Sequence, residues 1–95
     1  MIGSAMAAVR DNKAKSRFEL DVDGGVAFAN YRNTQAAVII THTETPVALR
    51  GHGIASQLIE GALALIRADG RKVIAGCGFV ADYLRKHPEH ADMVQ

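Results

Sequence analysis

The sequence predicts a small α+β domain whose elements follow the order β-β-β-α-β-α. Residues 16–22 and 26–32 alternate apolar and polar side chains, which is typical of half-buried strands. From Ile54 the apolar spacing changes to the 3.6-residue period of an amphipathic helix. Three strands before this helix, with one more strand and helix after it, predict a mixed sheet covered by helices.

The first three strands are expected at residues 16–22, 26–32 and 36–44. Asp23-Gly24-Gly25 predicts a tight hairpin turn, because glycine adopts a positive φ without a steric penalty. Asn33-Thr34 marks a second turn. Residues 36–44 are apolar on both faces, which indicates a central strand, and Pro46 ends it because proline cannot donate to a ladder.

The main helix is expected from Ile54 to the C-capping residue Gly70. A short buried strand follows at residues 72–77, and a second helix at 79–87 stops at Pro88. The tail from Glu89 is polar and is expected to be loose. The apolar stripe of the main helix comprises Ile54, Ala55, Leu58, Ile59, Ala62, Leu63, Leu65 and Ile66.

Length and composition indicate one domain with no electrostatic preference for a polyanion. The chain has 95 residues and a formal net charge of +1, so neither nucleic acid nor an anionic membrane is an expected partner. Residues 1–14 lack periodicity and are expected to be flexible, which leaves 15–95 as the domain. The N-terminal stretch has no basic residue before its short apolar part, unlike a signal peptide. One cysteine, Cys77, suits a reducing compartment, so a cytoplasmic location is expected.

A glycine-rich turn at residues 50–56 stands immediately before the main helix. The first turn of a helix has unpaired N–H groups and the positive end of the dipole. Gly51 and Gly53 would let an anion approach these groups closely, and Arg50 adds a charged donor. The pattern therefore predicts a phosphate or pyrophosphate site. A helix N-terminal turn that binds nothing is the alternative.

Three phosphate-binding patterns can be compared with this turn. A P-loop needs Lys and Ser/Thr after the last glycine, where Ile54 and Ala55 stand. A dinucleotide fingerprint needs a third glycine, where Ser56 stands, and a longer parallel sheet. The turn does resemble the R/Q-x-x-G-x-G/A pyrophosphate loop of the GNAT-superfamily N-acetyltransferases.

Two further stretches extend this resemblance over roughly residues 17–94: HTETP at 42–46 and CGFVADYLRKHPE at 77–89. Together with RGHGIASQL at 50–58, they look like a minimal GNAT subfamily that lacks the first two helices of larger acetyltransferases. Thr45 departs from the valine that is usual there. The resemblance implies a strongly twisted sheet, splayed between the strands at 36–44 and 72–77, that binds acetyl-CoA. The implied cofactor-binding residues are Thr43, Thr45, Arg50, Gly51, His52, Gly53, Ile54, Ala55, Ser56 and Lys86.

Four residues are candidates for the chemistry of acyl transfer. His42 and Glu44 lie two apart on one strand and so share a face, which suits a base and its orienting partner. A half-buried imidazole beside a strand-end carboxylate is the alternative. The resemblance places Cys77 near the acetyl sulfur, as a nucleophile, a proton donor or a small buried hydrophobic residue. Tyr83 occupies the place of a general acid in larger relatives, or is a core aromatic.

The sequence and the resemblance together predict an acetyl-CoA-dependent N-acyltransferase without a metal. The acetyl group would pass by direct attack to an amine on a small molecule or a protein. Because the helices that usually form the acceptor pocket are missing, an open site is expected, and the chain would act as a monomer or homodimer. The alternatives are a CoA- or acyl-CoA-binding module without turnover, and a structural protein that binds neither.

Overall fold

The computed structural model describes residues 8–95, so the expectations for residues 1–7 lie outside it. Five strands, two α-helices and three short 3₁₀ helices make up this part of the chain. The strands are β1 (Arg10–Asn12), β2 (Arg17–Val22), β3 (Gly25–Asn33), β4 (Ala37–Glu44) and β5 (Lys72–Ala75). The helices are α1 (Ile54–Ala68) and α2 (Gly78–Lys86), with η1 (Lys13–Lys15), η2 (Val47–Leu49) and η3 (Pro88–Met93).

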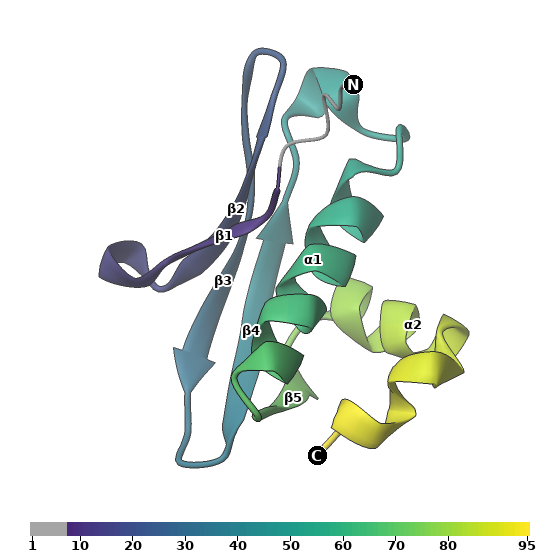
Figure 1. Cartoon of the computed structure of the whole chain (residues 1–95). Helices are drawn as coiled ribbons and strands as arrows, with labels where there is room; N and C mark the ends of the chain where they lie inside the picture. Colours follow the sequence, from purple (N-terminus) through teal and green to yellow (C-terminus); the bar gives the residue numbers. More distant parts are fainter. Residues whose placement is uncertain (1–7) are drawn as a thin grey trace, which may run out of the picture.

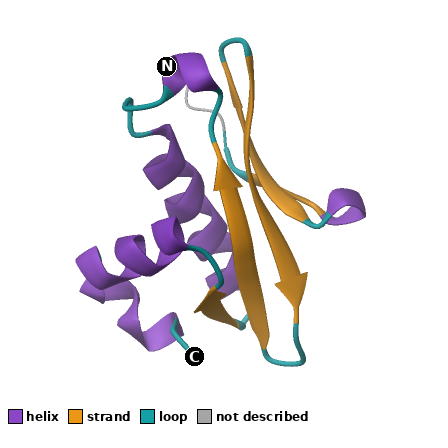
Figure 2. Cartoon of the chain, turned by 180° about the vertical axis from the view of Figure 1, so that it is seen from behind, coloured by secondary structure: helices purple, strands orange, loops and turns teal. Residues whose placement is uncertain are grey.

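All five strands form one mixed sheet in the order β1-β2-β3-β4-β5. The first three pairings are antiparallel, whereas β4 and β5 are parallel and joined by α1. Helix α1 crosses one face of the sheet, and α2 with η3 lies beside it at the β5 edge (Figure 1). The reverse view shows α1 and α2 together on the same side of the sheet (Figure 2). The predicted α+β class is confirmed, and β4 is an interior strand between β3 and β5, as its two apolar faces predicted.

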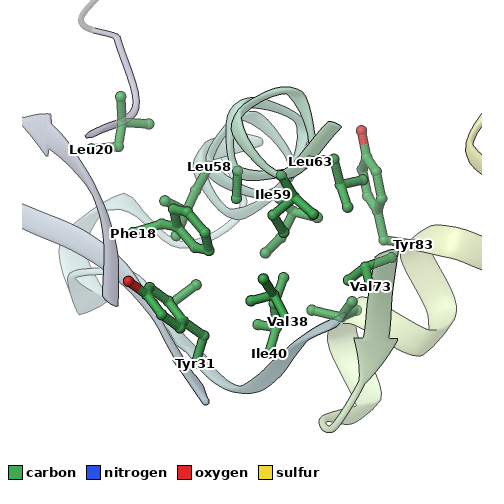
Figure 3. Packing of buried hydrophobic residues seen from close by; sticks show 14 of the residues in the cluster. Phe18, Leu20, Tyr31, Val38, Ile40, Leu58, Ile59, Leu63, Val73 and Tyr83 are labelled. Atoms are coloured by element: carbon green, nitrogen blue, oxygen red, sulfur yellow. The ribbon is translucent and has the colours of Figure 1, made fainter. Parts of the chain in front are cut away.

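The hydrophobic core lies between α1 and the sheet. Leu58, Ile59 and Leu63 of α1 are fully buried and point toward side chains of the strands (Figure 3). Most of the predicted apolar stripe is buried, but Leu65 remains 37% exposed because it lies at the margin of the stripe. Gly70 follows the helix with a φ of 71°, as expected for the residue after a helix C-cap. Among residues 8–95 no helix is both long enough and apolar enough to cross a bilayer.

The structure differs from the sequence expectation near both ends of the described chain. Residues 10–12, expected to be flexible, form strand β1 at the edge of the sheet, and 13–15 form η1. Apolar alternation could not predict this strand, because the side chains that join it to β2 are polar. Arg10 and Asn12 both donate hydrogen bonds to Glu19 of β2.

The tail from Glu89 is ordered rather than loose. It continues from the end of α2 as η3, whose Met93 is only 2% exposed and belongs to the core cluster. Beyond it, Val94 forms a parallel bridge with Val73, and the Gln95 N–H donates to the Val73 carbonyl at 3.0 Å. The buried Met93 therefore anchors this polar segment together with the buried His90, which bonds Glu60 of α1.

A β-bulge in β4 changes which side chains face α1. Asn30 pairs with His42 and Tyr31 with Ile40, so Thr41 is an extra residue without a directly opposite partner. Ile40 faces the core before the bulge. After it, Thr43 lies opposite the buried Ala29 and shares its face, because directly opposite residues lie on one face of an antiparallel pair.

Candidate active site

The predicted anion-binding turn lies immediately before the first residue of α1. After β4 the chain passes through η2 and reaches Gly51 and Gly53, which have φ values of 85° and 76°. Gly53 is the N-cap residue of α1. A Cβ built at either glycine would meet no heavy atom within 4 Å, so the turn is open to a ligand. Glycine is required here by the left-handed backbone rather than by crowding.

The first turn of α1 has donors available for an anion. The first bond into the helix runs from the Gln57 N–H to the Gly53 carbonyl at 3.0 Å. The N–H groups of Ile54, Ala55 and Ser56 precede this bond, and the first turn contains no acidic residue. Arg50 is exposed, and its side chain makes no hydrogen bond or ion pair with any residue from 8 to 95. This arrangement has the donors and the positive potential that a phosphate group requires.

The pairing of β4 with β5 ends halfway along β4, at Ile40. Its last bond runs from the Gly76 N–H to the Ile40 carbonyl at 2.8 Å. A Cβ at Gly76 would lie 2.8 Å from that same oxygen, so only glycine permits this close approach. Strand β5 ends at Ala75, two residues earlier than expected, because Gly76 and Cys77 lead into α2. Residues 41–44 of β4 continue without a partner strand on this side in the described chain.

Thr43 and Cys77 come together beyond the end of the β4–β5 pairing. The Thr43 hydroxyl lies 3.6 Å from the Cys77 sulfur, and either group can donate. Cys77 is half-buried and is the N-cap residue of α2. The structure therefore brings one predicted cofactor-binding residue and one candidate catalytic residue into contact across 34 positions of sequence.

His42 and Glu44 form a second pair on the opposite face of β4. His42 Nε2 lies 2.9 Å from Glu44 Oε1, and both side chains are about half exposed. Their face is shared with Phe28, whose ring centroid lies 6.4 Å from that of His42. The expectation that the two side chains share a face and interact holds in the structure. The pair can exchange a proton with solvent or with a ligand that approaches this face.

Tyr83 lies in a third environment, between α2, α1 and η3. Its hydroxyl donates to Glu60, and Glu60 also accepts a hydrogen bond from His90 Nε2 at 2.9 Å. Burial, reinforced by the Glu60 carboxylate, raises the pKa of Tyr83. The hydrogen bonds from Tyr83 and His90 lower the pKa of Glu60. The role of Tyr83 as a general acid stays a prediction. Neither Glu60 nor His90 was a candidate, because no local spacing links positions 30 residues apart.

The remaining predicted site residues lie at the protein surface. Lys86 Nζ is 3.0 Å from Asp82 Oδ2 on the same helix, and the Arg85 guanidinium bonds the same carboxylate. His52 is exposed within the glycine turn, and Thr45 follows β4 as half-buried loop. In residues 8–95 no three side chains of His, Cys, Asp or Glu are grouped so that they could hold a metal ion.

A mixed sheet whose interior strand β4 leads through a glycine turn into a helix is the arrangement expected of an acyltransferase of the GNAT type. Residues 17–93 match the family described as GCN5-related N-acetyl-transferase, and the chain belongs to that family. The NMR structure of a GCN5-like candidate N-acetyltransferase from Staphylococcus aureus superposes with a TM-score of 0.66. It is 21% identical, and the match covers 97% of this chain and 91% of that one, which supports the shared fold. No curated protein matches the chain in sequence.

Proposed function

We propose that this protein transfers an acetyl group from acetyl-CoA to an amine by direct attack. The observation that carries the proposal is the open turn with positive φ at Gly51 and Gly53, which lies at the start of α1. Its free N–H groups and the unpaired Arg50 supply an anion site suited to the pyrophosphate of CoA. Family membership supports acyl transfer as the reaction class.

The unpaired edge of β4 is suited to the pantetheine arm. Residues 41–44 have no partner strand on the β5 side within the described chain, so their backbone groups on that side are available to an amide-bearing ligand. An arm that follows this edge from the glycine turn would bring its thioester toward Thr43 and Cys77. A backbone N–H of this segment would then stabilise the oxyanion.

An ammonium acceptor must lose two protons in the reaction, and the departing thiolate gains one. The first loss gives the neutral amine, which attacks the thioester carbonyl; the nitrogen loses the second proton as the tetrahedral intermediate collapses, the C–S bond breaks and CoA thiolate leaves. We assign the base to His42, which Glu44 orients at 2.9 Å, so the amine would approach the edge of β4 from the face opposite Thr43 and Cys77. We assign the Cys77 thiol as the group that would donate a proton to the departing thiolate.

A thermal-unfolding experiment with CoA and acetyl-CoA tests the cofactor site. A ligand that binds only the native state at about 100 times its Kd stabilises it by about 2.7 kcal/mol, so both compounds should raise the melting temperature. Gly53→Ala should abolish this shift, because its methyl group would occupy the space in front of the helix N–H groups.

Gly70→Ala is the matched control for Gly53→Ala. It has a similar φ of 71° and the same open surroundings, but it lies at the other end of α1. Both variants should lose about 1–2 kcal/mol of folding stability through backbone strain, and only Gly53→Ala should lose the CoA shift. A normal CoA shift in Gly53→Ala would place the pyrophosphate elsewhere.

Thiol release from acetyl-CoA in the presence of a panel of amines tests the transfer itself. Acceleration by an amine supports the proposed reaction. Stabilisation by CoA with no thiol release for any amine would instead support a CoA-binding module without turnover.

A further inference from the structure

A cleft of about 480 Å³ lies at the opposite end of α1 from the glycine turn. Its walls come from the last turn of the helix, including Leu65 and Asp69, and from the sheet residues Phe18 and Tyr31. The 15-residue helix separates the two places by about 22 Å at 1.5 Å per residue. The volume is in the range of small-molecule sites, and the cleft is separate from the proposed acetyl-CoA site.

Two opposite charges flank a buried hydroxyl in this cleft. The Tyr31 hydroxyl donates to Asp11 Oδ1 at 2.6 Å. Burial, the hydrogen bond to Asp11 and its charge raise the pKa of Tyr31 to about 12, while the charge of Arg71 opposes this increase. Asp11 and Arg71 therefore both act on the same hydroxyl. The Arg71 guanidinium is held in place by one nitrogen, Nη2, which donates to the carbonyls of Thr34 and Ala37.

These two charges are not neutralised by each other. Asp11 and Arg71 both line the cleft, yet no ion pair joins them or joins either to another residue between 8 and 95. Lys13 and Asp69 are a second cation and a second anion that line the cleft. Neither forms an ion pair with a residue between 8 and 95. A ligand with one negative and one positive group would satisfy both kinds of charge at once.

The cleft also offers an apolar surface. Leu65 is 37% exposed although it belongs to the apolar side of α1, and it lines the cleft with the ring of Phe18. Phe18 and Tyr31 pack with their centroids 4.8 Å apart and form a rigid floor. An apolar group seated on Leu65 would remove this side chain from water.

We propose that this cleft binds a small amphipathic zwitterion, namely a free α-amino acid with an apolar side chain. Its carboxylate faces Arg71, its ammonium group faces Asp11, and its side chain covers Leu65. At about 22 Å from the glycine turn along α1, this is an accessory ligand site and not the place of acyl transfer.

Titration of the ¹⁵N-labelled protein with L-leucine tests the site, with two half-ligands as comparisons. Isovalerate keeps the carboxylate and isoamylamine keeps the ammonium group. Leucine should shift the amide signals of Leu65, Asp69 and Arg71 and bind at least about tenfold more tightly than either half-ligand. Absence of shifts at high millimolar leucine, or equal binding of a half-ligand, would overturn the proposal.

Three variants locate the binding and do not depend on CoA. Asp11→Asn keeps an oxygen for the Tyr31 hydroxyl but removes the charge, so leucine should bind it no better than isovalerate does. Leu65→Trp should fill the cleft and abolish binding, whereas Ala64→Trp, on the exposed side of α1 and outside the cleft, should leave it unchanged. Unchanged leucine binding in Leu65→Trp would show that the ligand sits elsewhere.

Discussion

At the residue scale, the surroundings of Cys77 bear on the mechanism. A thiol becomes a strong nucleophile when a cation or a helix N-terminus stabilises its thiolate. In the structure the hydrogen-bond partner of the sulfur is the hydroxyl of Thr43, and no basic side chain among residues 8–95 bonds it. Cys77 is also the N-cap residue of α2, but its side chain makes no capping hydrogen bond. This environment favours direct attack on the thioester over an acetyl-cysteine intermediate.

Substitution of Cys77 and His42 separates the two mechanisms. Cys77→Ala should keep measurable turnover, because the amine attacks the thioester itself. His42→Ala should lower kcat by about a hundredfold, the usual effect of losing a general base. Steady-state kinetics and intact-mass spectrometry after incubation with acetyl-CoA provide the measurements. An acetylated Cys77 that is consumed on addition of amine would establish a covalent intermediate instead.

The candidate site was predictable only where residues lie close in sequence or carry a family motif. The two-residue spacing predicted that His42 and Glu44 share a face, and the glycines predicted the turn at residues 50–56. The bond from Tyr83 to Glu60 joins two helices 23 positions apart, and its partner His90 lies in a tail without periodicity. No local pattern specifies such contacts, because they depend on how α1, α2 and η3 pack.

At the scale of elements, α1 contains a glycine that its helical propensity does not explain. Gly61 lies in the middle of the helix, where glycine costs about 1 kcal/mol relative to alanine. A Cβ at this position would lie 2.3 Å from Val9 Cγ2, in the segment that leads into β1. The glycine therefore permits the chain before β1 to cross close to the helix.

Gly61→Ala should destabilise the protein despite its gain in helical propensity. Relief of this contact requires Val9 to move away from α1, and we expect a net loss of about 1–3 kcal/mol. Gly78→Ala is the control, because this first residue of α2 has open space around its Cβ and should be neutral or stabilising. Urea unfolding of both variants measures the difference. A more stable Gly61→Ala protein would show that Val9 does not pack here.

Elements with strong apolar periodicity were predicted closely, whereas those held by polar contacts or by isolated buried side chains were not. The strands β2, β3 and β4 and both α-helices lie within a few residues of their expected positions. Strand β1 is three residues long and is joined to β2 through polar side chains, and η3 is held by the buried Met93 and His90 and by the ion pair of Asp92 with Arg67. The bulge at Thr41 also has no sequence signal, yet it determines that Thr43 faces Cys77 while His42 faces away.

At the scale of the whole molecule, the two faces of the sheet are stabilised differently. The face toward α1 is an apolar core, whereas the opposite face carries a polar network centred on Glu19. Glu19 is 3% exposed, covered by neighbouring side chains, and its carboxylate accepts hydrogen bonds from Arg17, Asn12 and Arg10. Arg17 also lies over the Phe28 ring, 4.5 Å from its centroid. On this face, charged hydrogen bonds stabilise the sheet in place of packing against a helix.

This network makes folding stability depend on pH in a defined direction. The Arg17 hydrogen bond, then those from Asn12 and Arg10, lower the pKa of Glu19 below its ordinary value of 4.5, against the opposing effect of burial. A carboxyl group with a lowered native pKa contributes its full stabilisation above the unfolded value. That contribution is lost as the pH falls from about 4.5 through the lower native pKa.

Glu19→Gln should therefore destabilise the protein at neutral pH and progressively less below pH 4.5. The amide keeps the shape of the side chain but loses the charge that three donors share, so a loss on the order of 1–3 kcal/mol is expected at pH 7. Glu89→Gln is the control, since Glu89 is exposed and forms no ion pair with any residue from 8 to 95. Urea unfolding of the three proteins across this pH range gives the comparison. A wild-type advantage that stays constant into acid would show that the ionised form of Glu19 is not what stabilises the pairing of β1 with β2.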